Sequence, residues 1–263
     1  MSRDIFDAIP SWAVFLLTCV VILGALEFGY RLARWRKKAV TTDQNAPIGV
    51  ATGAILGLVS FLLAFTFGIA ASHYDARKAT VLEEANAIGT AHLRADFLPE
   101  AQKAEAAALL RDYTQLRLSA ALARVNRQEY DEVVRRSEEI HGKLWRLVVS
   151  NAAADPTPVS ALLVSAVNDV IDLHSKRITH GVHNRIPMAI WLGLYAVSCV
   201  GIASAAYRIS QSANKRSDML PALTFAFAAV MTLIADLDDP RHGFLLNDQA
   251  PLQATLTIFD AGN

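Results

Sequence analysis

Long apolar stretches alternate with long polar ones along the chain, and this pattern predicts an all-α membrane protein. A helix needs roughly 20 apolar residues to cross a bilayer. Two windows almost free of charge reach this length, a third reaches it only by including Glu27, and a fourth is slightly short. We therefore expect four transmembrane helices, at about 11–32, 47–72, 186–207 and 219–235. The alternative is a large soluble protein in which these segments are buried core helices.

Between the second and third expected spans lies a polar insert, residues 73–185, whose apolar residues recur at helical spacing. One such stripe runs through Leu109, Tyr113 and Leu116, as is typical of an amphipathic helix. Turn signals are found at Leu98–Pro99, around Asn126 and at 155–158. The insert is therefore expected to be an extramembrane bundle of about four helices.

The expected organisation follows from these segments. Residues 1–72 and 186–235 form two transmembrane hairpins, 73–185 form the bundle, and 236–263 form an acidic turn with a short tail. No turn signal follows the second span, so we expect it to continue into water as one long helix, from about Pro47 to Phe97. The first span is interpreted as retained rather than as a signal peptide, because its basic cluster follows the apolar stretch.

Composition and charge exclude several classes of protein. Apolar residues make up 53% of the chain and the formal net charge is zero, so overall charge favours no particular partner. The two cysteines, Cys19 and Cys199, both lie inside expected spans and leave no disulfide framework or cysteine metal site. Basic residues lie at membrane flanks without interleaved aromatic residues, so nucleic acid binding is not expected.

Basic residues in the short loops predict the orientation in the membrane. They cluster after the first span and between the third and fourth spans, at Arg31, Arg34, Arg36, Lys37, Lys38, Arg208, Lys215 and Arg216. Both loops lie on one side, which the positive-inside rule assigns to the cytoplasm. The helical insert and both termini are then expected outside.

Glycines in the second span predict close helix packing. Gly49, Gly53 and Gly57 repeat every four residues, a spacing that lets helix backbones approach each other in lipid. The pattern fits packing within one subunit as well as packing between subunits around an axis.

Aromatic residues extend this repeat. Steps of four drift by only about 40° on a helix, so Phe61 and Phe65 share a face with Gly57. Several copies around an axis would make the phenylalanines a hydrophobic constriction, and cationic His73 and Arg77 near its mouth would favour anions. Phenylalanines that pack against lipid or in the core are the alternative.

Carboxylates cluster after the fourth span, at Asp236, Asp238 and Asp239. Several carboxylates are what a hard cation such as calcium requires, but the spacing of an EF-hand is missing. An acidic turn that pairs with nearby basic residues, such as Arg241 or His242, is the alternative.

Other polar residues have structural interpretations. Glu27 precedes Arg31 by four residues, which predicts a local ion pair. Four polar residues on an otherwise apolar insert helix are expected to hydrogen-bond across a helix interface or to line a vestibule: Glu84, Asn86, Thr90 and His92. The histidines His174, His180 and His183 are expected to form a solvated flank. No nucleophile–base pair or phosphate loop is recognised, so no enzyme is expected.

Three motifs resemble a bacterial family of bestrophin-like membrane proteins and, more distantly, the bestrophin ion channels. They are SFLLAF at 60–65, EANAIGTAHLRAD at 84–96 and DLDDPRHGF at 236–244. The resemblance implies a pentameric channel in a bacterial inner membrane, with a pore neck on the second span at Gly57, Phe61 and Phe65. Bestrophins carry a bulky residue where this chain has Gly57.

The resemblance also bears on the acidic turn and on the orientation. It implies a calcium clasp at Asp236, Asp238 and Asp239, and it places the insert and termini of true bestrophins in the cytosol, against the loop charges. Two hypotheses follow for function. One is an oligomeric anion channel, and the other is a membrane-anchored helical sensor or scaffold without transport activity.

Overall fold

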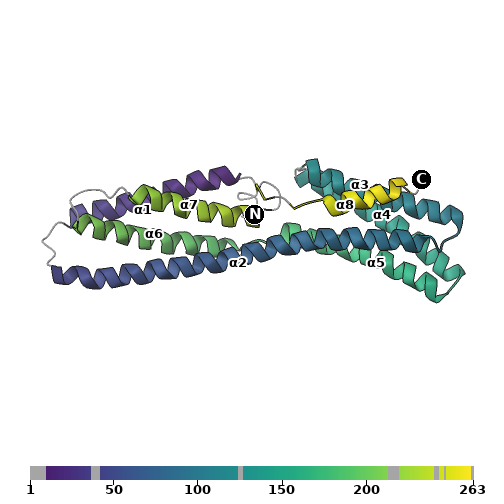
Figure 1. Ribbon diagram of the computed structural model, residues 1–263, viewed down its shortest axis with the longest axis horizontal. Helices are drawn as coiled ribbons and strands as arrows, with labels where there is room; N and C mark the ends of the chain where they lie inside the picture. The colour runs from purple at the N-terminus through teal and green to yellow at the C-terminus, as the bar shows by residue number, and fades with distance from the viewer. Residues whose placement is uncertain are drawn as a thin grey trace. The chain divides into compact units, whose positions relative to one another are not determined.

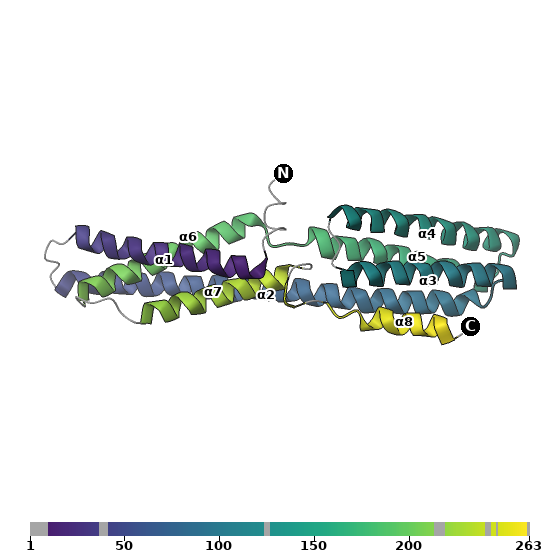
Figure 2. The same cartoon turned by 90° about the horizontal axis from the view of Figure 1, so that it is seen from above.

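The computed structural model describes residues 10–36, 42–123, 127–212, 219–239, 243–245 and 247–261. All regular structure within these ranges is helical (Figures 1 and 2). The helices are α1 (Ser11–Trp35), α2 (Thr42–Ala95), α3 (Glu100–Ala123), α4 (Arg127–Ala154), α5 (Pro158–Ile178), the π-helical turn η2 (Thr179–His183), α6 (Met188–Ser212), α7 (Met219–Asp238) and α8 (Ala250–Ala261). The expected all-α fold is confirmed.

Helix boundaries follow the local sequence signals. The second span does continue as one helix, because α2 runs without a break to Ala95. Pro99 separates α2 from α3, as expected. At the start of α5, Thr157 forms a capping box with Ser160, and Pro158 follows the cap. The break expected around Asn126 lies outside the described residues.

The chain divides into two compact units. Unit 1 comprises Met1–Tyr74 and Arg185–Leu245, and unit 2 comprises Asp75–Asn184 and Leu246–Asn263. Unit 1 therefore contains α1, α6, α7 and the first part of α2. Unit 2 contains the second part of α2 with α3, α4, α5, η2 and α8.

In unit 1, α1 packs against both α6 and α7. Apolar residues from these helices fill the core, among them Ile22, Ile202 and Met231. A hydrogen bond of 2.6 Å joins Thr18 Oγ1 of α1 to the Tyr195 hydroxyl of α6. The Thr18 hydroxyl donates to the Val14 carbonyl oxygen, so Tyr195 is the donor in this pair.

Membrane-spanning character is found in three helices among the described residues: α1, α2 from Gly49 onward, and α6. These helices are long and apolar enough to cross a bilayer, which fits an integral membrane protein. The fourth expected span, in α7, stays a prediction. At the end of the first span, Arg31 Nε donates to Glu27 Oε1 at 3.0 Å, which confirms the expected ion pair.

Replacing Gly29 by alanine is expected to destabilise unit 1. A Cβ atom at Gly29 would lie 2.2 Å from the Ala203 carbonyl oxygen of α6, so α1 and α6 would have to separate. Overpacking of this kind costs about 1–3 kcal/mol. Thermal unfolding of the detergent-solubilised protein measures the effect. Gly24→Ala is the control, because no atom lies within 4 Å of that Cβ; equal melting temperatures would contradict the prediction.

In unit 2, the second part of α2 packs with α3, α4 and α5 around a core that includes Ile88, Leu110, Val148 and Val170. The short tail also contributes, because α8 packs against α3. Leu252 and Phe259 of α8 are buried in the same core, and Arg111 Nη2 lies 2.6 Å from Asp260 Oδ1. This helix is not among the elements predicted from the sequence.

Candidate pore face, acidic turn and buried polar network

The expected neck residues lie on an exposed side of α2. Phe61 is 65% exposed and Phe65 is 63% exposed, although both lie in a span rich in apolar residues. Their rings are stacked, with centroids 6.5 Å apart and an interplanar angle of 16°. A Cβ at Gly57 would have no atom within 4 Å. Gly57, Phe61 and Phe65 therefore lie on a side of α2 that is not covered by other described helices of the same chain.

Small residues surround the two phenylalanines. Exposed glycine, alanine and serine residues line the same region of α2, beside the larger exposed side chains of Val50, Leu58 and Phe67: Gly53, Ala54, Gly57, Ala64, Gly68 and Ser72. Large apolar residues are more frequent on the exposed side of α1, among them Trp12, Leu16 and Val20. Among the expected packing glycines, Gly49 lies close to the side chain of Arg208: a Cβ at Gly49 would lie 2.8 Å from Arg208 Nη2. Gly53 has open space around it, and its role in packing stays a prediction.

His73 and Arg77, the two expected mouth cations, do not share this exposed side. His73 Nδ1 lies 3.4 Å from Asp238 Oδ1 of α7, so the ring is directed into unit 1. Arg77 is only 4% exposed. Their role at a pore mouth stays a prediction, and the structure does not bring them together with Phe61 and Phe65.

The three carboxylates after the fourth expected span bond to residues of neighbouring segments in unit 1. Asp236 Oδ1 accepts hydrogen bonds from Ser11 Oγ and the Phe244 amide, both at 2.7 Å. Asp238 accepts from the Ile186 amide at 3.1 and 3.2 Å. Asp239 Oδ1 lies 3.6 Å from Arg185 Nη2. All three residues are buried, as expected of carboxylates that have partners.

Within one chain, the described residues of this turn do not bring together a set of ligands for a metal ion. Among the described residues, no group of three or more histidine, cysteine, aspartate or glutamate residues is placed to hold a metal ion. Protein donors already contact the three carboxylates. Calcium binding by Asp236, Asp238 and Asp239 stays a prediction, and Arg241 and His242 lie outside the described residues.

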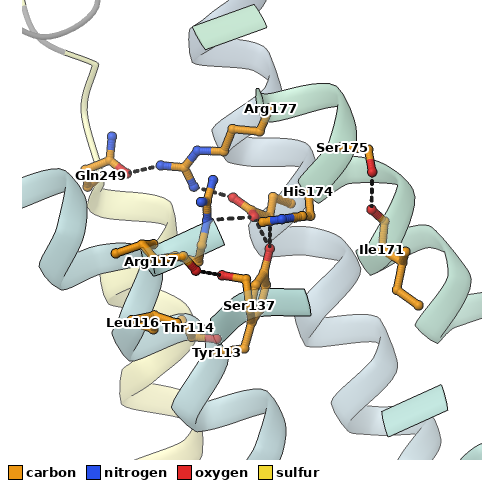
Figure 3. A network of polar contacts seen from close by, with 12 residues as sticks. Tyr113, Thr114, Leu116, Arg117, Ser137, Ile171, His174, Ser175, Arg177 and Gln249 are labelled. Carbon is orange, nitrogen blue, oxygen red and sulfur yellow. Dashed lines mark hydrogen bonds and ion pairs between the residues drawn. The ribbon is translucent and has the colours of Figure 1, made fainter. Parts of the chain in front are cut away.

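Unit 2 contains a buried polar network whose shared partner is Glu84 of α2; Figure 3 shows several of its members, among them Tyr113, Arg117 and Arg177. The Tyr113 hydroxyl of α3 donates to Glu84 Oε1 at 2.5 Å, and Arg117 Nε lies 3.4 Å from the same oxygen. Arg177 of α5 donates to Glu84 Oε2. Glu84 and Tyr113 are fully buried and Arg117 nearly so. One carboxylate thus holds two guanidinium groups and a phenol in the centre of the bundle.

The network extends to α4, α5 and the segment before α8. The Tyr113 hydroxyl donates its proton to Glu84. His174 Nδ1, which lies 3.3 Å from the phenolic oxygen, is therefore the donor in the contact between these two residues. The ring of His141 lies 4.6 Å from that of Tyr113 and 4.9 Å from that of His174. Figure 3 shows Arg177 also reaching Gln249, whose Oε1 accepts at 3.0 Å. Five segments of unit 2 therefore meet at this network.

The network holds its histidines neutral. Burial, followed by the nearby Arg117 charge, lowers the pKa of His141 to about 4. The same two causes lower the pKa of His174 to about 3. Burial also raises the pKa of Tyr113 well above its ordinary value, so the phenol stays protonated and donates to Glu84. This arrangement stabilises a bundle and offers no activated nucleophile.

Acid is expected to destabilise unit 2 because of this histidine pair. Both pKa values in the folded state lie below the ordinary value near 6.5, so the unfolded chain binds protons first as the pH falls. Each histidine then costs about 1.4 kcal/mol of stability per pH unit between 6.5 and its folded pKa. Melting temperatures at pH 7.5 and 5 measure the loss. The double variant His141→Gln, His174→Gln should lose much of this pH dependence; an unchanged dependence would contradict the account.

Of this network, Glu84 was predicted from the sequence and its partners were not. A helix–helix interface was one of its two expected roles, and the structure shows that role. Tyr113 was assigned to the apolar stripe of α3, and Arg117 one turn later was overlooked, although a charge on such a stripe is itself a signal. The expectation of a solvated flank is wrong for His174, which is buried. His180 is half-buried and its Nδ1 lies 2.9 Å from Thr80 Oγ1; the side chain of His183 lies outside the described residues.

Comparison with known proteins agrees with the all-helical fold. The family model described as a Bestrophin-like domain matches residues 15–246. A crystal structure of a bacterial bestrophin homologue from Klebsiella pneumoniae, carrying one substitution, superimposes with a TM-score of 0.60 at 16% identity, over 95% of this chain and 96% of that one. Another structure of the homologue gives a TM-score of 0.56 at 17% identity, over 94% of each chain. No curated protein sequence matches the chain.

Proposed function

The chain belongs to the bestrophin-like family, and we propose that it is an ion channel in which several copies surround an axis with α2 at the centre. The phenylalanine side chains of Phe61 and Phe65 form the narrow neck, and Gly57 leaves a wider position before them. The exposure of this stacked pair within an apolar span is the observation that carries the proposal. A pentamer in a bacterial inner membrane is the form that the family resemblance suggests.

The residues around Phe61 and Phe65 support the view that this side of α2 faces other copies of α2 rather than lipid. Lipid-facing surfaces favour large aliphatic side chains, whereas interfaces between helices in membranes favour small ones. The exposed small residues of α2 allow copies to approach closely, and Phe61 and Phe65 then narrow the space between them. Hydrophobic constrictions of this kind control ion passage by excluding water.

An enzymatic role is not proposed, because bestrophins are channels and the network around Glu84 offers no activated nucleophile. Anion conduction was expected from His73 and Arg77 facing the axis. His73 instead contacts Asp238 and Arg77 is buried, so the geometry within one chain lends that expectation no support.

Ion flux from liposomes that contain the purified protein tests the proposal. Vesicles loaded with potassium chloride are diluted into an impermeant salt, and the release of each ion is followed beside that from empty vesicles. Release above the empty-vesicle rate supports the channel. Rates equal to those of empty vesicles over a range of pH, calcium and voltage would instead favour a membrane-anchored sensor or scaffold.

A further inference from the structure

The outward face of α1 is apolar along most of the helix and basic at its end. On a helix with about 100° per residue, the large exposed side chains of α1 point within about 80° of the direction of Val20. Arg31 and Arg34 are exposed on this face, whereas Gly29, which lies against Ala203 of α6, points the opposite way. The apolar members of the face are Trp12, Leu16, Leu17, Val20, Leu23, Phe28 and Trp35. The two arginines therefore continue an apolar face that is turned away from the packed side of α1.

The last turn of α1 lies at the depth of the lipid headgroups when the helix crosses a bilayer from its first residue. The helix has 25 residues, which at about 1.5 Å per residue extend about 37 Å, whereas the hydrocarbon core is about 30 Å thick. A crossing that begins at Ser11 therefore ends near Arg31, and Arg34 and Trp35 lie beyond it. Trp35 is 84% exposed, and tryptophan is enriched at this depth because its ring is apolar and its N–H is polar.

Positive charge exceeds negative charge on this part of α1. Glu27 is the only acidic residue of the helix, and its Oε1 lies 3.0 Å from Arg31 Nε. The side chain of Arg34 has no ion pair or hydrogen bond with any residue that the structure describes. One carboxylate therefore offsets one arginine, and the donors of the Arg34 guanidinium are open to a ligand.

We propose that this end of α1 binds an anionic phospholipid, with the Arg34 guanidinium on the headgroup phosphate and the acyl chains along the apolar face. A guanidinium group matches a phosphate group with two parallel hydrogen bonds. The apolar side chains before it, Phe28 and Val20 among them, are large, whereas contacts between membrane helices favour small residues. A zwitterionic headgroup would bring its own cation beside two arginines, so a headgroup with a net negative charge, such as that of phosphatidylglycerol, is favoured. The proposal needs only that α1 spans the membrane, and it does not depend on a channel.

Fluorescence quenching by brominated phospholipids tests the proposal. The protein is reconstituted in phosphatidylcholine that contains an equal fraction of brominated phosphatidylglycerol or of brominated phosphatidylcholine, each brominated close to the headgroup. The difference in quenching between each protein and its Trp35→Phe form reports on the lipid beside Trp35. In the wild-type protein, brominated phosphatidylglycerol should quench this part of the fluorescence more strongly. Arg34→Gln should lower the preference for phosphatidylglycerol about fivefold, the contribution of one basic residue near an anionic surface.

Two further variants separate a binding site from a general attraction to charge. Arg34→Lys should lose less of the preference than Arg34→Gln, because it keeps the charge but not the paired hydrogen bonds. Arg36→Gln removes an exposed arginine that points about 160° away from Val20, and it should leave the preference unchanged. Equal quenching by the two lipids in the wild-type protein, or an equal loss in Arg34→Gln and Arg36→Gln, would overturn the proposal. Gel filtration in detergent shows that each variant is assembled like the wild type before quenching is compared.

Discussion

Replacing Phe61 and Phe65 together by alanine is expected to raise the ion flux of reconstituted protein. The two exposed, stacked rings are the large apolar side chains at the expected neck positions, and their removal lets water fill that region. If the rings contribute a barrier of only about 1.4 kcal/mol, their loss raises the rate about tenfold. The measurement is the initial rate of ion release from liposomes at equal protein density.

A matched control separates the neck from general effects of losing an aromatic side chain. Phe28 of α1 is 62% exposed, close to the exposure of Phe61, but it lies on a different helix. Phe28→Ala should leave the flux unchanged. Equal flux through the wild type and the Phe61→Ala, Phe65→Ala double variant would show that these rings do not limit ion passage.

Replacing Glu84 by glutamine is expected to destabilise unit 2 strongly. The substitution leaves Arg117, which is nearly fully buried, and Arg177 without their shared carboxylate. Removing one partner of a buried ion pair costs roughly 3–5 kcal/mol. At about 2–4 °C per kcal/mol, the melting temperature of the purified protein should fall by roughly 10 °C.

The adjacent residue provides the control. Glu83 forms an ion pair with Lys176 at the surface, and surface pairs contribute little to stability. Glu83→Gln should therefore melt within a few degrees of the wild type. If the two variants, which make the same chemical change one residue apart, melt at the same temperature, the network around Glu84 does not hold unit 2 together.

Local and periodic features of the fold were predictable from the sequence. The uncharged windows indicated the three helices that are long and apolar enough to cross a membrane, and Pro99 and Pro158 marked helix boundaries. The helix α8 was missed although Leu252, Leu256 and Phe259 have helical spacing, because the segment is short and follows an irregular turn. The helical spacing of these residues is explained by the structure, in which Leu252 and Phe259 are buried in the core of unit 2.

Features of the candidate site that depend on angle or on distant partners were less predictable. His73 and Arg77 were expected at the mouth because they follow the neck along the helix axis. The structure instead places His73 beside Asp238 and buries Arg77. The partners of Glu84 lie 29 and 93 residues away in the sequence, and no local pattern connects them.

The most direct test of the central claim asks whether the outward side of α2 lines a water-filled path. In a protein with Cys19 and Cys199 replaced by alanine, Phe65→Cys is compared with Leu23→Cys, an exposed position of α1. Each is reconstituted in liposomes and treated with a charged thiol reagent that does not enter lipid. The channel predicts much faster labelling at position 65 than at position 23. Equally slow labelling at both positions would show that this side of α2 faces lipid, and would contradict the channel.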